Sequence, residues 1–376
     1  MPNSFLEIKN IARQALPRLI ENLVFPNLIY KDYSDAFEDG KGATVQVRKP
    51  VVLTASEFDS SLGVTAQDVK EESVEVTLDK LATVDVEFGA IARATNVDDL
   101  NRLFIEPAAA ALASKINSDG LALYADIPYY VGTAGTTPDG LDDFANAAKV
   151  LDNNKCPVDS RFGVWNPDAM AKFRQIGDIV NAEKSGATQA LRAGSIGNIF
   201  GIDNYMSQGI KTATSGNLTP GGTNASGLKV EANVTANQTI SLISNATASG
   251  TLSGSVKVGD IVVIGSNKYV CILAADAASN KVSVKLNKAV TVNANTAVTV
   301  IQGGAQNLVF HQNAFAFVTR PLIAPAGVES YTTSYNGISL RVTRGYNMQY
   351  KKETLSMDVL YGYKTMYPEL ACRVLG

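Results

Sequence analysis

The sequence predicts an α+β protein whose host domain is interrupted by a small all-β domain, and three observations lead to this prediction. Apolar and polar residues alternate, as they do in strands, over residues 43–53 and 73–88. An alanine-rich segment that begins at Pro107 has high helix propensity. Residues 212–304 have a composition of their own, after which the earlier composition returns. The host domain is therefore split around an insertion.

Residues 1–42 predict an N-terminal arm. Its apolar residues follow helical spacing, while Pro17 and Pro26 are expected to interrupt any long helix. Such a segment cannot bury its apolar face alone, so we expect it to lie on another part of the chain or on a neighbouring copy. The apolar residues are Phe5, Ile8, Ala12, Leu16, Leu19 and Leu23.

The two alternating runs predict one long hairpin over residues 43–88, with a polar, acidic tip between its strands. A hairpin without covering layers is marginally stable, so a projecting one is expected to pack on a partner. The charged residues of the tip are Glu57, Asp59, Asp68, Lys70, Glu71 and Glu72.

Helical signals follow the hairpin. Thr95 or Asn96 can cap a first helix, and Pro107 suits the first turn of a longer one that extends to about Tyr124. Two more helices are predicted over 141–151 and 167–176, on either side of a strand around Trp165. Together these elements indicate an α+β host.

The insertion at 212–304 holds six lysines, three acidic residues and one aromatic residue, Tyr269, among many small polar residues and valines. Short β-rich runs with turn residues between them predict a small barrel or sandwich. In the last segment, from Gly337 onward, alternation predicts two closing strands.

Composition excludes several classes of function. The 33 basic and 36 acidic residues give a net charge of -3, which argues against tight duplex binding through positive charge. Charged residues make up only 18% of the chain, below the usual ~25%, which favours surfaces committed to assembly. No run reaches the ~18 apolar residues that span a bilayer, and the charged start does not resemble a signal peptide, so we expect a cytoplasmic chain. Cys156, Cys271 and Cys372 are expected to be buried free thiols.

No catalytic or metal-binding constellation emerges, and we expect neither enzymatic activity nor a cofactor. The single histidine, His311, cannot form a multi-histidine metal site and is expected to be structural. Paired acids such as Asp98/Asp99 and Asp142/Asp143 begin helices, where the dipole favours them. No phosphate-binding loop is present. Basic residues near aromatics after Arg341 would give at most weak, salt-sensitive contact with nucleic acid.

The order of these segments resembles a known family. The arm and acidic hairpin are followed by VDDLNRLFIEPAAAALASKIN, VWNPDAMAKF, GNIFGIDNYMS, the inserted β domain and NLVFHQNAFAFVTRPL. This order is similar to that of the tailed-phage major capsid proteins of HK97-type fold. More narrowly, it resembles the branch of the short-tailed Salmonella phage coat protein (the P-twenty-two type), in which a β domain interrupts the A-domain.

The resemblance implies a domain map and a function. The map is an N-arm at 1–42, an E-loop hairpin at 43–88, a P-domain with its spine helix at 89–130, an A-domain at 131–211, the inserted β-barrel-like domain at 212–304, and the A-domain return with closing P-domain strands at 305–376. The implied function is self-assembly, as hexamers and pentamers, into an icosahedral shell that encloses the phage dsDNA and expands from a precursor. Implied partners are further copies of the chain, a scaffolding protein, a portal and, weakly, the packaged dsDNA, with no membrane; the implied location is the virion, after assembly in the bacterial cytoplasm.

The resemblance also implies which residues meet neighbouring copies. These are the charged E-loop tip at Glu57, Asp59, Asp68, Lys70, Glu71 and Glu72, and the arm residues Phe5, Arg13 and Arg18. A candidate inter-capsomer loop of the insertion contains Ser244, Asn245, Thr251 and Ser255. No isopeptide cross-link is expected, because the resembling branch forms none and the tip carries only Lys70 among its acids.

Three alternatives stay open at this point. An encapsulin-type compartment shares the fold but lacks an insertion like 212–304. An adhesive β protein would suit the Thr- and Asn-rich insertion but not the alanine-rich helix or the missing export signal. An enzyme that works through carboxylates would need two distant acids with opposed pKa values, and no such pair stands out.

Overall fold

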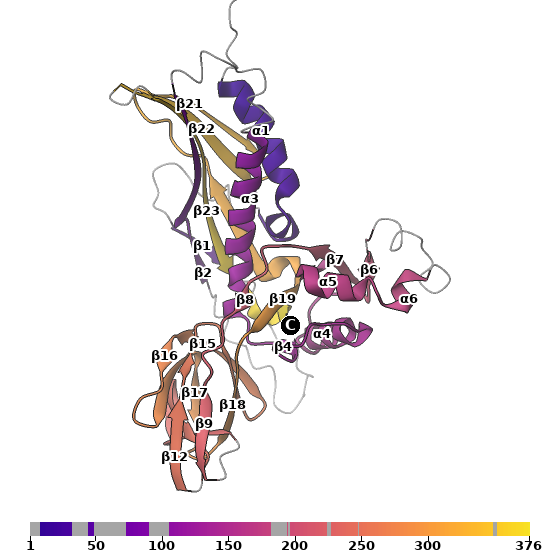
Figure 1. Ribbon diagram of the computed structural model, residues 1–376, viewed down its shortest axis with the longest axis vertical. Helices are drawn as coiled ribbons and strands as arrows, with labels where there is room; N and C mark the ends of the chain where they lie inside the picture. The colour runs from indigo at the N-terminus through magenta and orange to yellow at the C-terminus, as the bar shows by residue number, and fades with distance from the viewer. Residues whose placement is uncertain are drawn as a thin grey trace, which may run out of the picture. The chain divides into compact units, whose positions relative to one another are not determined.

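The computed structural model describes residues 8–31, 44–48, 73–89, 105–181, 194, 196–223, 227–246, 248–348 and 352–376. The chain forms two compact units. The first consists of residues 1–22, 30–112 and 316–366, and the second of residues 23–29, 113–315 and 367–376. Helices and sheets occur in both units, which confirms the predicted α+β class (Figure 1).

The first unit is built on an antiparallel sheet in which β23 pairs with β22, β3 and β20, and β22 pairs with β21. Asn336 and Gly337 join β21 to β22 with positive φ angles of 52° and 70°, as a two-residue hairpin turn requires. The strands are β3 (Lys80–Gly89), β20 (Phe315–Arg320), β21 (Glu329–Tyr335), β22 (Ile338–Asn347) and β23 (Lys352–Thr365).

Helix α1 (Ile8–Asn22) packs on β21 and β22 of the same unit (Figure 1). Its apolar stripe, including Ala12, Leu16 and Leu19, is buried as the spacing predicted. The expectation that Pro17 interrupts the helix is wrong, because α1 continues through it. A proline inside a helix costs about 3 kcal/mol, and burial of the stripe on both sides of Pro17 offsets that cost.

The predicted hairpin is also corrected. Strand β1 (Thr44–Arg48) pairs with β2 (Ser73–Thr77), but residues 80–89 form β3 and pair with β23. The run breaks at Leu78, where the chain passes so close to β23 that a Cβ at Gly362 would collide with the Thr77 carbonyl. Over the described residues, the ladder of β3 with β23 is longer than that of β1 with β2. The predicted helix at Thr95 lies outside the described residues.

The second unit contains an open sheet in the order β4-β24-β19-β5-β7-β6, with β8 paired to β19. We call this the host sheet. Its strands are β4 (Tyr130–Gly132), β5 (Arg161–Trp165), β6 (Asn198–Ile199), β7 (Ile202–Met206), β8 (Thr212–Ala213), β19 (Gly304–His311) and β24 (Ala371–Leu375).

Helices lie beside the host sheet and bury an aromatic cluster. The Asn166 side chain accepts a hydrogen bond from the Ala169 amide and so caps α5, while Phe144 and Phe173 pack against Trp165. The alanine-rich helix is α3 (Glu106–Leu121), and the boundary between the two units falls within it. The other helical segments are η1 (Phe25–Leu28), η4 (Ala122–Asp126), α4 (Leu141–Asn153), α5 (Pro167–Phe173), α6 (Gly177–Val180), η5 (Gln312–Ala314) and η6 (Pro368–Leu370).

Between β8 and β19 the chain forms a closed barrel in the order β10-β11-β17-β15-β14-β18 (Figure 1). Along β17, Val282, Val284 and Leu286 point into an aliphatic core while alternate residues are exposed. The barrel strands are β10 (Leu228–Val230), β11 (Val234–Ser244), β14 (Ile261–Ile264), β15 (Asn267–Leu273), β17 (Lys281–Val292) and β18 (Ala297–Ile301). Two short pairs adjoin them, β9 (Thr219–Thr223) with β12 (Ala248–Ser253) and β13 (Ser255–Val256) with β16 (Ala275–Asp276).

Candidate assembly surfaces

The exposed side of α1 carries the two described arm residues. Arg13 is exposed, and Arg18 lies 3.2 Å from Glu106 and 3.6 Å from Glu21. These ion pairs face solvent, where each contributes about 0–1 kcal/mol, so they leave the surface available for other contacts. Phe5 lies outside the described residues.

The acidic tip of the hairpin lies outside the described residues as a whole, so its role stays a prediction. This applies to Glu57, Asp59, Asp68, Lys70, Glu71 and Glu72. The base of the hairpin is described, because β1 and β2 pair in antiparallel register from Thr44 to Arg48.

The stretch from Ser244 to Ser255 is not one loop, which corrects the sequence interpretation. Ser244 ends β11, is buried and donates a hydrogen bond to the Gly221 carbonyl at 2.8 Å, and Ser255 is buried in β13. Between them β12 pairs with β9, so tertiary pairing overrides the turn preference of Ser and Gly in this stretch. The Asn245 side chain accepts a hydrogen bond from the Gly227 amide and is partly buried. Of the four predicted loop residues, Thr251 is the one that is exposed.

The sequence interpretation missed an exposed apolar group at the β6–β7 edge of the host sheet. Phe200 is 57% exposed at the turn between the two strands, and Tyr205 and Met206 are each 40% exposed on β7. Phe200 has a φ of 51°, a region that bulky residues seldom adopt. The signal was present in the sequence as Phe200-Gly201 between two strand-like runs, which is a turn pattern.

The histidine and the three cysteines are all buried. His311 is buried, its Nδ1 accepts a hydrogen bond from the Asn313 amide, and burial lowers its pKa, so it stays neutral near pH 7. All three cysteines are buried, and burial raises the pKa of Cys372 to about 12. Over the described ranges, no group of three or more His, Cys, Asp or Glu side chains could hold a metal ion. Nor is any described helix long and apolar enough to cross a membrane.

Comparison with known proteins identifies the fold. No protein-family model and no curated protein matches the chain. A chain from a solved structure of Mycobacterium phage Che8 is 18% identical, with a TM-score of 0.52 over 94% of this chain and 90% of that one. A chain from the capsid structure of the cyanophage P-SCSP1u is 14% identical, with a TM-score of 0.50 over 89% of this chain and 84% of that one.

These similarities extend over nearly the whole chain, so they include both compact units. The chain therefore has the α+β fold of a phage capsid chain.

Proposed function

We propose that this chain is the major capsid protein of a tailed phage and that its copies assemble into a closed icosahedral shell around dsDNA. The observation that carries the proposal is the fold shared with a cyanophage capsid chain over 89% of this chain. The low charged content of 18% agrees with a subunit whose surface is largely covered by neighbours.

In the HK97-type description, the proposal assigns a role to each part. Helix α1 belongs to the N-arm, and β1 and β2 form the base of the E-loop. The sheet of the first unit and α3 belong to the P-domain, the host sheet belongs to the A-domain, and the barrel is the domain inserted into it. This assignment places the chain in the branch of coat proteins that carry an inserted β domain.

Copies of one chain that close rings of both five and six need heterologous contacts that tolerate several angles. We assign these contacts to the N-arm, the E-loop tip and the apolar edge at Phe200, Tyr205 and Met206. An exposed aromatic edge can bury apolar area against a neighbour without a fixed charge pattern, so it suits contacts at more than one angle. Re-docking of the arm and the E-loop would then permit a precursor shell to expand.

The remaining partners follow from the same proposal. A net charge of -3 suits weak, sequence-independent contact with packaged DNA and not tight binding. A scaffolding protein would bring subunits together during assembly in the bacterial cytoplasm, a portal would occupy one vertex, and the finished protein would be part of the virion. The fold needs no cofactor for this role.

The experiment is expression of the full chain, alone and with a co-expressed scaffold candidate, followed by size-exclusion chromatography and negative-stain microscopy. Hollow particles, hexamers or curved sheets are the expected result. A stable monomer in both conditions, even at high protein concentration, contradicts the proposal.

Matched variants test the E-loop tip. We expect Glu71→Gln with Glu72→Gln to reduce particle yield while the subunit stays folded, because the tip loses two charges that meet a neighbour. The control is Asp276→Asn with Glu329→Gln, which changes the net charge equally at two other exposed acids. Equal yields from the two double variants would remove the acidic tip from the contact.

A further inference from the structure

The barrel and the host sheet have separate apolar cores. Side-chain contacts between the two parts involve charged groups. Lys268 of β15 places its Nζ 4.4 Å from the centre of the Tyr130 ring on β4, and Lys288 of β17 lies 3.6 Å from Glu369 of η6. Lys288 and Glu369 are largely exposed, so solvent screens their ion pair. These outer contacts are therefore weak by themselves.

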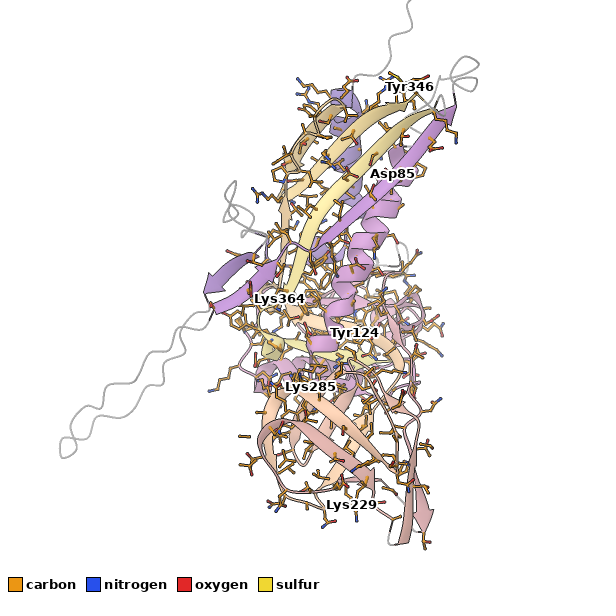
Figure 2. The ribbon with its side chains drawn as sticks, turned by 90° about the vertical axis from the view of Figure 1, so that its left-hand side faces the viewer. Asp85, Tyr124, Lys229, Lys285, Tyr346 and Lys364 are labelled. Carbon is orange, nitrogen blue, oxygen red and sulfur yellow. The ribbon has the colours of Figure 1, made fainter. Side chains whose placement is uncertain are left out.

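A buried arginine lies between the two parts. Arg373 belongs to β24 of the host sheet and is 1% exposed. Its Nε donates to the Ile127 carbonyl at 2.6 Å on the host side, and its Nη1 donates to the Gly259 carbonyl at 2.7 Å in the loop before β14 of the barrel. The guanidinium also lies 5.5 Å from the centre of the Tyr124 ring on η4, which Figure 2 labels.

This arginine is held at an energetic cost. Burial lowers its pKa to about 10, so the side chain stays charged at neutral pH although it is removed from water. Its Nη2 has no hydrogen-bond partner among the described residues. Of the two short bonds, the one from Nη1 to the Gly259 carbonyl joins the host to the barrel, and its charged donor makes it stronger than a bond between neutral groups.

The loop that receives Arg373 is fitted closely to the host. Gly259 has a φ of +92°, and a Cβ there would lie 3.1 Å from the Ala125 Cβ and 3.2 Å from a Tyr124 ring carbon. The chain also leaves the barrel through Gly303 and Gly304, whose φ angles are +80° and +82°. Two parts of a chain that lack a large apolar interface move relative to one another by default. A further contact is therefore needed to fix the barrel's orientation on the host sheet.

We propose that Arg373 is a positioning residue: it latches the barrel to the host sheet and fixes the barrel's orientation, while each part keeps its own core when the latch is removed. Loss of the latch leaves two folded parts whose relative orientation is no longer held by a buried hydrogen bond. The inference concerns the single subunit and stands whether or not the chain builds a shell.

The test uses the full chain below the concentration at which it associates. Spin labels are placed at Lys149→Cys on α4 and Ser283→Cys on β17, which are both exposed. The native cysteines are buried with raised pKa values, so they are not expected to react with the label. Pulsed electron paramagnetic resonance then gives the distance distribution between host and barrel.

We expect one narrow distribution for the parent protein and a distribution about twofold broader for Arg373→Met, because a domain pair without a strong contact moves by default. Circular dichroism and the Trp165 emission should stay native in both. The control is Arg161→Met, which removes a buried guanidinium whose carbonyl and carboxylate partners, Pro157, Cys156 and Asp152, all lie in the host. It should lower stability without broadening the distribution.

An unchanged distribution in folded Arg373→Met would overturn the proposal, as would equal broadening in Arg161→Met. If Arg373→Met does not fold, Gly259→Ala decides the question from the barrel side, because its Cβ displaces the loop and leaves Arg373 in place. Broadening in Gly259→Ala supports the latch, and a distribution as narrow as the parent's rejects it.

Discussion

The barrel is closed and has no edge strand, whereas the host sheet is open and has two. The barrel closes through pairing of β10 with β18, so none of its six strands is an edge. The host sheet is open and ends at β4 and β6, and exposed Phe200, Tyr205 and Met206 lie along the β6–β7 edge. A closed barrel needs no neighbour, whereas an open edge with exposed aromatics can bind one. Under the proposed function, we therefore expect the open edge of the host sheet to offer backbone pairing to a neighbouring copy, which the closed barrel wall cannot do.

The barrel and the host sheet also differ in the kind of side chain that fills their cores. The barrel core is aliphatic, and Tyr269, the one aromatic residue of the insertion, is only partly buried. The host core is centred on Trp165, whose ring lies 4.9 Å from those of Phe144 and Phe173. Because Trp165 is the only tryptophan, its fluorescence reports the host alone. The independence of the two cores can therefore be measured.

The largest change is removal of the barrel. Ala213 of β8 pairs with Gly304 of β19, so the ends of the insertion lie side by side. Replacing residues 214–303 with an Asn-Gly turn should close a two-residue hairpin and leave a host that unfolds cooperatively. Urea unfolding followed by Trp165 emission checks this. Loss of a cooperative transition would mean that the host needs the barrel in order to fold.

Truncation in the host core should have the next largest effect. Phe173→Ala removes a fully buried ring beside Trp165 and should lower the free energy of unfolding by about 3–5 kcal/mol. Trp165 fluorescence should report this loss, while hydrogen exchange in barrel peptides should stay unchanged. A parallel rise in exchange across the barrel would show that the cores are coupled.

A matching truncation in the barrel core should destabilise the barrel and leave the host unchanged. Leu242→Ala leaves a cavity in the aliphatic core and should cost about 2–5 kcal/mol. Amide exchange should rise over residues 228–301, and the host transition seen by Trp165 should not move. A matching shift of that transition would argue against two separate cores.

The smallest expected effect is a pH dependence at Asp260, at the start of β14. Burial raises the pKa of this carboxyl above its ordinary 3.8, although Gln302, the Lys257 amide and charges on Arg373 and Lys257 oppose the shift. The folded state therefore holds the proton to higher pH, and the barrel loses stability as pH rises from about 3.8 through the raised value. Asp260→Asn should remove this loss, as measured by exchange of barrel amides between pH 3.5 and neutrality. A variant with the same pH dependence as the parent would contradict this assignment.

Local sequence was sufficient where local preferences decide the structure. Alanine content predicted α3, and the apolar pattern over residues 167–176 predicted α5. It failed where distant pairing decides: Pro17 did not end α1, and β3 left the hairpin to join β23. In both places, burial and pairing with segments far along the chain outweigh the local signal.

Local sequence was also insufficient to predict which residues of the candidate surfaces are exposed. Composition predicted that the protein associates, but the family resemblance led us to expect an inter-capsomer loop containing Ser244 and Ser255, which are buried. The aromatic edge was missed because exposure of Tyr205 depends on the position of β7 in the sheet. Nothing local indicated that Arg373, in the run ACRVLG, is buried at the junction between the host sheet and the barrel.

Electron cryomicroscopy of the full chain, expressed with and without a scaffold candidate, shows whether the protein builds a shell. We expect closed icosahedral shells in which rings of five and six copies form and each subunit carries one barrel of six strands. A chain that stays monomeric at high concentration in both preparations would contradict this expectation.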